Sequence, residues 1–226
     1  MRLYNKKFPN IYFKKDNRGR IQLYTINSTP GIKFFEEDIL KIGGKEYRFF
    51  DARRSKLAAA ILKGISQTGI KEDSYILYLG ASHGYTPSFL SDIIKDRGFI
   101  YAVEFAPRVI RDLVFLSEKR NNIVPILADA NQPLTYKARI TNVDIVYQDV
   151  AQRNQAEIFL KNCNLYLKKG GFGLLAVKAR SVDISKKPRQ VYQEIRNILE
   201  KNITVVDYKI LDPFEKDHCI YVIKKK

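Results

Sequence analysis

The chain has 226 residues, which suits one full-sized domain with at most a small appendage. Its apolar fraction of 45% is enough for a packed core, and no stretch is long and apolar enough to cross a membrane. The formal net charge of +16 predicts a polyanionic partner such as nucleic acid. The alternative is a lysine-rich, solvated surface without such a partner.

The two cysteines, Cys163 and Cys219, form neither a Cys-x-x-Cys pair nor metal-ligand spacing with His83 or His218. We therefore expect buried, reduced thiols and no bound metal, which is typical of a cytoplasmic protein. The N-terminal stretch MRLYNKKFPNIYFKK also lacks the continuous apolar segment of a signal peptide.

Short β-prone runs dominate residues 1–52. NIYFKKD, IQLYTI and KEYRFFD are separated by the turn-forming stretches NRGR, NSTPG and IGG. This pattern predicts a small antiparallel β module over 1–52 and a second unit over 53–226.

From residue 53, helical and strand-like runs alternate. RRSKLAAAILKGI carries a helical apolar stripe, and YILYLG follows it as the first buried strand. The next expected elements are a helix over 86–97, the strand FIYAVEF, a helix over 107–120, the strands IVPILAD and VDIVYQDV, a helix over 155–167 and the strand GFGLLAVKA. This alternation predicts an α/β fold with a mostly parallel sheet and helices on both faces.

The residue types at the helix ends support these bounds. Thr86 and Pro87 suit the N-cap and the first helical position, and Gly98 suits the position after the last turn. The charged stretch ARSVDISKKPRQ is the best candidate for an exposed loop. A helix over 188–201 and the strands ITVVDYKIL and CIYVIKK follow it, and the two strands suggest a hairpin at the sheet edge.

One loop has two interpretations. Gly80-Ala81-Ser82-His83-Gly84 has the G-x-S-x-G spacing of a hydrolase nucleophile, and Asp149 or Asp212 with His218 completes a Ser…Asp…His order. The context is poor for a hydrolase, because only a small module and one helix precede the loop. The other interpretation is a cofactor site, since ligands of open α/β sheets bind at the carboxyl ends of strands.

Three carboxylates favour the cofactor interpretation. Glu104, Asp129 and Asp149 end successive strands, and Glu104 follows the first glycine by about twenty residues, the spacing at which an acid binds ribose hydroxyls in dinucleotide folds. The loop is not G-x-G-x-x-G, and no helix N-terminus is plainly built to hold pyrophosphate. S-adenosylmethionine, which has no phosphate, therefore fits better than NAD.

Several stretches together resemble one family. YLGASHGYTPSFLSDI, YAVEFAPRVIRDL, VDIVYQDVAQRNQ and DPFEKDHCIYVI, with RSKLAAAI upstream, resemble archaeal fibrillarin in order and spacing over nearly the whole chain. The resemblance implies a Rossmann-like class I methyltransferase that uses S-adenosylmethionine to methylate ribose 2′-hydroxyls in rRNA and tRNA. It also implies work inside a box C/D ribonucleoprotein, with a guide RNA, a Nop-type scaffold protein and a kink-turn-binding ribosomal-type protein as partners.

The resemblance assigns site residues position by position. It implies a catalytic set of Lys56, Asp149, Lys178 and His218. It implies cofactor contacts at Gly80, Tyr85, Thr86, Glu104, Phe105, Asp129, Ala130, Asp149, Val150, Ala151 and Gln152. Basic side chains are expected to bind RNA phosphates without reading sequence, and they are Arg53, Arg54, Arg108, Arg180, Lys186 and Lys187.

Our hypothesis for the chemistry makes Lys178 the general base for the 2′-hydroxyl and Asp149 the group that orients Lys178. We expect Lys178 to be partly buried beside Lys56. His218 is expected to steer the hydroxyl or to hold a lysine in place.

The glycine loop departs from the family's usual G-x-A-S-G-T-T, because Ser82, His83 and Tyr85 replace alanine, serine and threonine. Tyr85 is expected to contact the cofactor through its backbone or to stack on an apolar part of it. Two alternatives stay open: a stand-alone RNA 2′-O-methyltransferase, and a structural RNA-binding subunit without activity.

Overall fold

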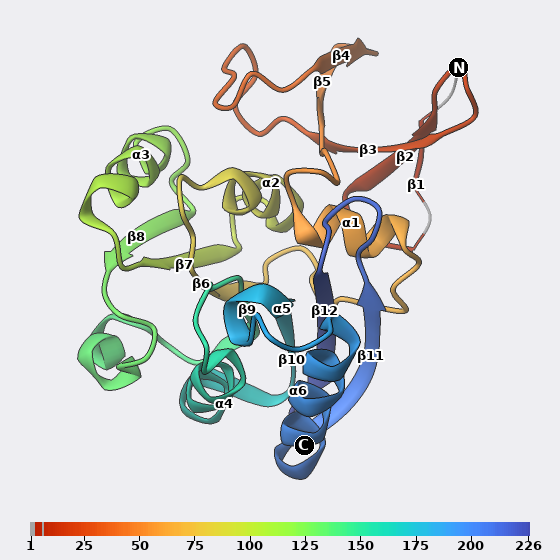
Figure 1. Cartoon of the computed structure of the whole chain (residues 1–226). Helices are drawn as coiled ribbons and strands as arrows, with labels where there is room; N and C mark the ends of the chain where they lie inside the picture. The colour runs from red at the N-terminus through yellow and green to blue at the C-terminus, as the bar shows by residue number, and fades with distance from the viewer. Residues whose placement is uncertain (1–2, 6) are drawn as a thin grey trace.

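The computed structural model describes residues 3–5 and 7–226, and within them the strands form two sheets (Figure 1). The N-terminal sheet has the order β1-β2-β3-β5-β4, and all its neighbouring strands are antiparallel. Its strands are β1 (Tyr4–Asn5), β2 (Ile11–Lys15), β3 (Ile21–Ile26), β4 (Ile39–Ile42) and β5 (Lys45–Phe49). The expected antiparallel module is confirmed, with β1 and β4 as strands that the sequence pattern did not indicate.

The second sheet has the order β11-β12-β10-β9-β6-β7-β8. The strands from β10 to β8 run parallel, whereas β12 and β11 form the expected antiparallel hairpin at one edge. Their bounds are β6 (Tyr75–Leu79), β7 (Phe99–Glu104), β8 (Ile123–Leu127), β9 (Val143–Gln148), β10 (Leu167–Lys178), β11 (Thr204–Ile210) and β12 (His218–Lys224).

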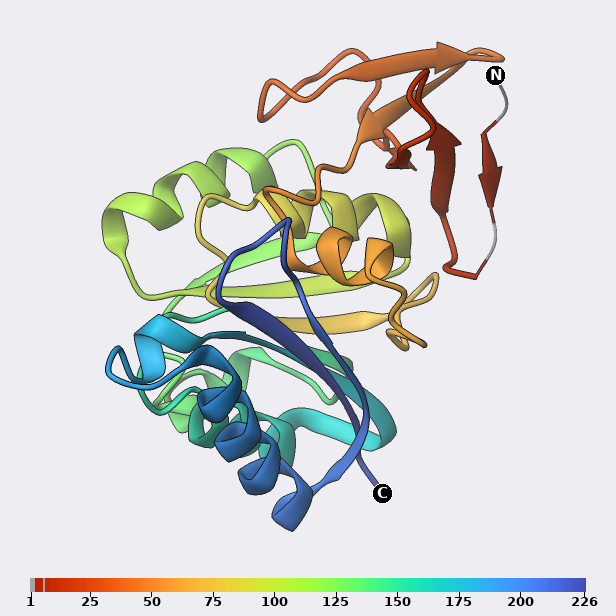
Figure 2. The same ribbon diagram turned by 45° about the vertical axis from the view of Figure 1, so that its right-hand side comes forward.

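Helices cover both faces of this sheet, as the alternation predicted. Figure 2 shows α1 (Lys56–Leu62), α2 (Tyr85–Ile94) and α3 (Pro107–Ser117) on the face that also carries the N-terminal sheet. The other face carries α4 (Gln155–Tyr166) and α6 (Pro188–Asn202), while a 3₁₀ helix (Pro133–Arg139) and the short α5 (Ala179–Val182) complete the chain. Among the helices of the described residues, none is long and apolar enough to span a bilayer.

Two expectations about helix ends were wrong. Helix α2 begins at Tyr85 with Gly84 as its N-cap, and the Thr86 hydroxyl instead donates to Ser55 Oγ at 3.0 Å. The helix ends at Ile94 because Lys95 adopts a φ of 60°, so Gly98 does not follow its last turn. The expected exposed loop over 179–190 is also only partly a loop, because α5 begins it with a buried Ala179.

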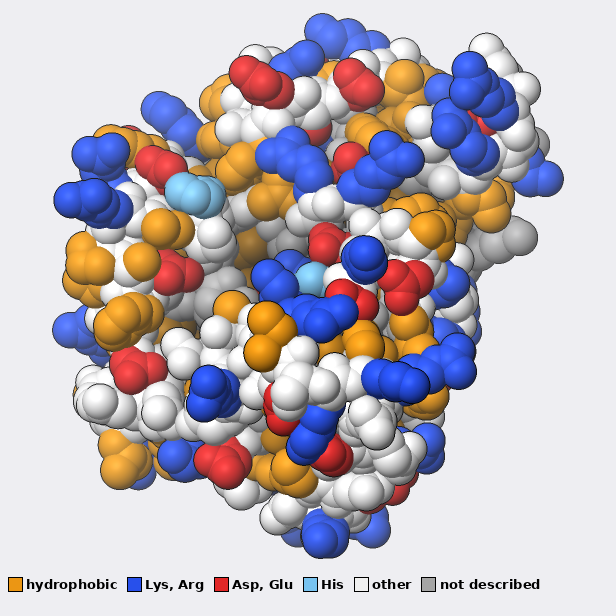
Figure 3. All heavy atoms as spheres, viewed as in Figure 1, with side chains coloured by type: hydrophobic (Ala, Val, Ile, Leu, Met, Phe, Trp, Pro, Cys, Tyr) orange, Lys and Arg blue, Asp and Glu red, His pale blue; other side chains and the backbone are white. Residues whose placement is uncertain are grey.

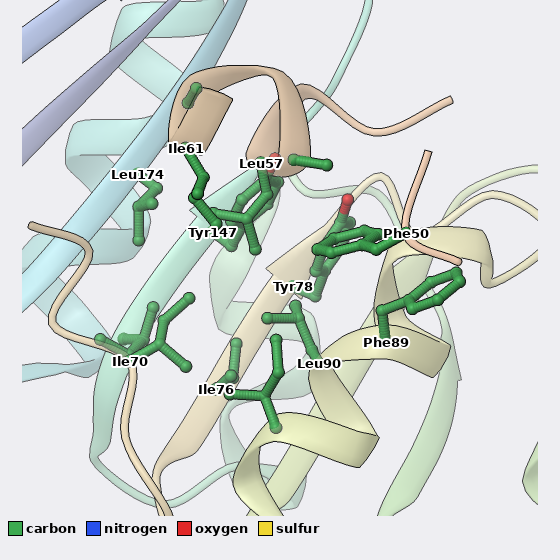
Figure 4. Close-up of a cluster of buried hydrophobic side chains, with 14 of the residues drawn as sticks. Phe50, Leu57, Ile61, Ile70, Ile76, Tyr78, Phe89, Leu90, Tyr147 and Leu174 are labelled. Carbon is green, nitrogen blue, oxygen red and sulfur yellow. The ribbon is translucent and has the colours of Figure 1, made fainter. Parts of the chain in front are cut away.

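The two sheets share one buried core. Figure 4 shows Phe50 of the N-terminal part facing Phe89 of α2, and their rings stack with centroids 4.4 Å apart. Burying a phenylalanine side chain contributes roughly 2 kcal/mol to folding. Tyr78 and Tyr147 stack in the same way at 4.6 Å on neighbouring strands. Because the core is continuous, the division of the chain after residue 52 stays a prediction.

A buried charge cluster also joins the two parts. Arg48 of β5 lies 2.6 Å from Glu37 and 2.7 Å from Asp92 of α2, and Arg120 lies 2.6 Å from the same aspartate. All four side chains are essentially inaccessible to solvent. Two guanidinium groups and two carboxylates balance in charge, which is the condition under which buried ions are tolerated. The cluster therefore fixes the N-terminal sheet against α2.

Both cysteines are free and buried, as expected. Burial raises the pKa of the Cys163 thiol and of the Cys219 thiol. Neither thiol is therefore ionised near neutral pH, and both act as small apolar core groups.

Candidate active site

Two adjoining cavities lie at the carboxyl ends of the parallel strands. The strand-end cavity has a volume of about 250 Å³ and is lined by Gly80, Ser82, Val103, Glu104, Phe105, Ala128, Asp129, Ala130, Asp149, Val150, Ala151, Gln152 and Ile158. The module-side cavity has about 620 Å³ and reaches the N-terminal sheet; its lining includes Phe34, Phe35, Arg54, Lys56, Tyr78, Tyr85 and Thr86. Gly80, Ser82 and Asp149 line both, so the two cavities can hold two ends of one ligand.

Gly80 allows the loop after β6 to pass close to the strand beside it. Its φ is 78°, and a Cβ there would collide with the backbone carbonyl oxygen of Asp149. The N–H groups of Gly80 and Ala81 both donate to the Val103 carbonyl, at 2.9 and 3.0 Å. A glycine is therefore required where the two cavities meet.

Glu104 holds the loop in place and stays available to a ligand. One carboxylate oxygen accepts from the Ser82 N–H at 2.8 Å, and the other accepts from the N–H groups of Phe105 and Ala106, at 2.9 Å each. A carboxylate has about four acceptor sites, so ribose hydroxyls can still donate to it. The Phe105 ring, 69% exposed beside it, offers an apolar surface for a flat base.

The strand-end cavity therefore fits the nucleoside half of the expected cofactor. Asp129 accepts from the Asn131 N–H at 2.8 Å and keeps its other oxygen for a ligand. All the expected cofactor residues line one cavity or the other, with only Tyr85 and Thr86 confined to the module side. The structure thus brings the expected set together, and the individual contacts stay predictions.

Lys56 and Asp149 form an ion pair at the inner end of the module-side cavity. Lys56 Nζ lies 3.0 Å from Asp149 Oδ2, and the two side chains are 21% and 25% exposed. Burial alone would lower the pKa of Lys56, but the Asp149 carboxylate outweighs it and the pKa rises above its ordinary value. Lys56 is therefore fully charged at neutral pH. The expectation that Asp149 orients Lys178 was wrong, because its ion-pair partner in the structure is Lys56.

Lys178 and His218 face each other across two antiparallel strands, because Lys178 ends β10 and pairs in register with His218 at the start of β12. His218 is nearly buried, and its Nδ1 donates to the Lys216 carbonyl at 2.7 Å, which leaves Nε2 free to accept. Lys178 is exposed, so the expectation of partial burial was wrong.

Glu215 is a site residue that the sequence argument missed. Its carboxylate lies 4.0 Å from His218 Nδ1, and burial raises its pKa while the charges of Lys56, His218 and Lys178 act in the opposite direction. The Asp149 carboxylate raises the pKa of Glu215 further, so Glu215 lies near all four expected catalytic side chains. The only signal was its position three residues before His218 in EKDH.

Tyr85 is held by the N-terminal sheet and its connections. Its ring packs edge-on against Phe35, and the Arg54 guanidinium lies 4.2 Å from its centroid. Burial raises the pKa of Tyr85 to about 12, so the phenol stays neutral. His83, the other substituted position, donates through Nδ1 to Asp112 at 2.7 Å.

Ser82 has no catalytic support in this arrangement. Asp149 pairs with Lys56, and His218 bonds to the Lys216 carbonyl, so one of the two candidate acids and the base of the hydrolase interpretation are engaged elsewhere. The Ser82 N–H instead fixes Glu104. The G-x-S-x-G spacing thus belongs to the turn that lines both cavities.

Some of the expected RNA-binding side chains form ion pairs with carboxylates of the protein, and others are simply exposed. Arg53, Arg108 and Lys187 are exposed, whereas Arg180 pairs with Asp217 at 3.2 Å and Lys186 pairs with Glu194 at 2.8 Å. Figure 3 shows basic and acidic side chains gathered with a histidine beside the hollow near the centre of the molecule. The RNA contacts stay predictions.

Comparison with known proteins identifies the family. A family model named Fibrillarin matches residues 3–226. The chain belongs to the fibrillarin family. A fibrillarin-like rRNA/tRNA 2′-O-methyltransferase of Methanocaldococcus jannaschii is 48% identical over 216 residues, which cover 95% of this chain and 94% of that protein.

Two solved fibrillarin structures have the same fold as this chain. An Aeropyrum pernix fibrillarin with natively bound S-adenosylmethionine has a TM-score of 0.91 and 41% identity, covering 99% of this chain and 98% of the other. A fibrillarin in complex with Nop5p has a TM-score of 0.87 and 36% identity, covering 98% and 100%. The expected Rossmann-like class I methyltransferase fold is confirmed.

Proposed function

We propose that this fibrillarin transfers the methyl group of S-adenosylmethionine to ribose 2′-hydroxyls of rRNA and tRNA, as the catalytic subunit of a box C/D guide ribonucleoprotein. The observation that carries the proposal is the Lys56–Asp149 pair, which lines the module-side cavity. The cross-strand neighbours Lys178 and His218 lie close to the same carboxylate, Glu215, as this pair. The relatives named as rRNA/tRNA 2′-O-methyltransferases support the substrate and the reaction.

The two cavities divide the cofactor between them. Glu104 would accept from the ribose hydroxyls, Phe105 would cover the adenine and Asp129 would accept from its amino group. The methionine end would occupy the module-side cavity, where α2 begins without a side-chain cap and its first two residues, Tyr85 and Thr86, can offer backbone N–H groups to a carboxylate. The bound cofactor supplies the electrophilic methyl group.

The basic side chains have different parts in the proton transfer. Lys56 is held charged by Asp149, so it stabilises the developing negative charge on the 2′-oxygen and does not accept its proton. Lys178, whose side chain is exposed, is the candidate general base, and its cross-strand neighbour His218 orients the hydroxyl through Nε2. Most of the rate is expected to come from holding the oxygen in line with the methyl group.

The general-base assignment is tested by Lys178→Ala and Lys178→Arg. General bases contribute about 100-fold to 10,000-fold, so both variants should lose methyl transfer on that scale while binding S-adenosylhomocysteine normally. Transfer should be measured against pH with a short target RNA. Near-wild-type rates in both variants would contradict the assignment.

The partners are supported to different degrees. A related fibrillarin was solved with Nop5p, which supports a Nop-type scaffold protein as partner here. The guide RNA and the kink-turn-binding ribosomal-type protein are proposed from the family resemblance and from the net charge of +16. A cytoplasmic location in an archaeal cell stays a prediction.

A further inference from the structure

One wall of the module-side cavity comes from outside the methyltransferase sheet. Phe34 and Phe35, in the connection from β3 to β4, line it together with Arg54, which precedes α1. We propose that this connection of the N-terminal sheet is part of the site for the methionine end of the cofactor, and that Tyr85 links the two. This inference rests on the proposed use of S-adenosylmethionine.

Three side chains form a closed set of contacts at this wall. The rings of Phe35 and Tyr85 meet edge to face, with centroids 5.3 Å apart at an angle of 71°. The Arg54 guanidinium covers the Tyr85 ring at 4.2 Å and donates to the Phe35 carbonyl at 2.8 Å. Each member therefore touches the other two, so displacing one removes contacts from both partners.

Tyr85 connects these contacts to the N-terminus of α2, where the cofactor is expected to bind. It is the first residue of α2, directly after the N-cap Gly84, and its ring also packs on Phe89 at 5.1 Å. Its hydroxyl accepts from the Asp51 N–H at 3.3 Å. A shift of the ring would thus shift the helix N-terminus at which the methionine carboxylate is expected.

The N-terminal side of the wall is firmly anchored. The Phe35 N–H donates to Glu37 Oε2 at 2.9 Å, and Glu37 is itself paired with the buried Arg48 of β5 at 2.6 Å. A side chain without a ring at position 85, such as threonine, could not make these contacts. The coupling between sheet and cofactor is therefore a property of the aromatic residue in this chain.

The test compares two probes by isothermal titration calorimetry. S-adenosylhomocysteine has the whole amino-acid end, whereas 5′-methylthioadenosine lacks it. In Phe35→Ala, S-adenosylhomocysteine should bind about tenfold more weakly, since one edge-to-face contact and its neighbours are lost, whereas 5′-methylthioadenosine should bind as to the wild type. Phe49→Ala, in the same sheet but packed on Tyr24, is the matched control and should keep the affinity for both probes.

Three results would overturn the inference. Phe35→Ala could bind S-adenosylhomocysteine like the wild type, it could lose both probes equally, or Phe49→Ala could lose as much as Phe35→Ala. If the wild type binds neither probe, the proposed function itself fails.

A second comparison tests the role of Tyr85 as the link. If Tyr85 carries the coupling, Phe35→Ala should have little further effect on S-adenosylhomocysteine affinity in a Tyr85→Thr chain. An equal loss in both backgrounds would exclude Tyr85 as the link. Thermal unfolding of each variant shows whether the sheet remains folded.

Discussion

The Lys56–Asp149 pair shows how one side chain's state is set by its neighbour. Only 21% of the Lys56 side chain is exposed, yet the Asp149 carboxylate, 3.0 Å away, keeps the lysine charged. Removing one partner of such a largely buried pair destabilises the fold, because the other charge is left uncompensated. The contribution of the pair to stability can be tested by varying the pH.

We predict that the Lys56–Asp149 pair stabilises the fold at every pH from about 7 to about 9. The pKa of Lys56 is raised in the folded state, so its contribution is complete below the ordinary value of 10.5 and is lost as the pH rises through the higher folded value. The difference in Tm between the wild type and Lys56→Met should therefore be constant over that range. A difference that shrinks between these pH values would contradict the prediction.

The proximity of the four expected catalytic residues was predictable, but the contacts among them were not. The resemblance placed Lys56, Asp149, Lys178 and His218, and the fold brings them to one end of the sheet. The pairing of Asp149 with Lys56 depends on where α1 packs, which no local pattern specifies. Glu215 was missed for the same reason, because it reaches the site through the turn between β11 and β12.

At the scale of elements, the conformation of the loop from β6 to α2 depends on two glycines with positive φ, Gly80 and Gly84. The sequence predicted the strand, the loop and the helix, but it favoured Thr86 as the cap. Gly84, with a φ of 89°, takes that place instead, and a Cβ there would lie 2.6 Å from Leu116. Tertiary packing against α3 therefore overrides the local capping preference.

We predict that Gly80→Ala abolishes cofactor binding and destabilises the fold by more than about 2 kcal/mol. The added Cβ would meet the Asp149 backbone, and alanine at positive φ adds strain. Gly170→Ala is the matched control, because Gly170 has a similar φ of 74° with nothing within 4 Å of the added Cβ. It should cost about 1 kcal/mol in urea unfolding and leave S-adenosylhomocysteine binding unchanged. Equal effects at both positions would show that strain alone matters.

At the scale of the whole molecule, the buried charge cluster joins the two sheets. Strand and helix periodicity predicted both sheets, but the four charged residues come from separate elements, and their periodicity carries no sign of the pairing. Arg48 and Asp92 are ordinary charged residues in the sequence and become completely buried only when β5 packs on α2. Such a cluster is a property of the assembled fold.

We predict that this cluster makes the protein sensitive to acid. Burial alone would raise the pKa of Asp92, but the guanidinium groups of Arg120 and Arg48 outweigh it and hold the pKa below the ordinary value of 3.8. The stabilisation is therefore present above that value and lost as the pH falls below it. Asp92→Asn should cost about 3–5 kcal/mol in urea unfolding at pH 7, and the cost should shrink as the pH is lowered below the ordinary pKa of 3.8. A cost that stays the same as the pH is lowered would contradict this assignment.

The central claim is methylation of a guide-specified ribose, and it is tested most directly by radiolabelled methyl transfer from S-adenosylmethionine to a short target RNA. The reaction should be run with and without a matched guide RNA and the Nop-type and kink-turn-binding partners. We predict one labelled ribose, opposite the guide-specified position, only in the complete mixture, and no label when that nucleotide is 2′-deoxy. Transfer to the target RNA alone would indicate a stand-alone enzyme. No transfer in the complete mixture, or label that persists on the 2′-deoxy target, would contradict the account.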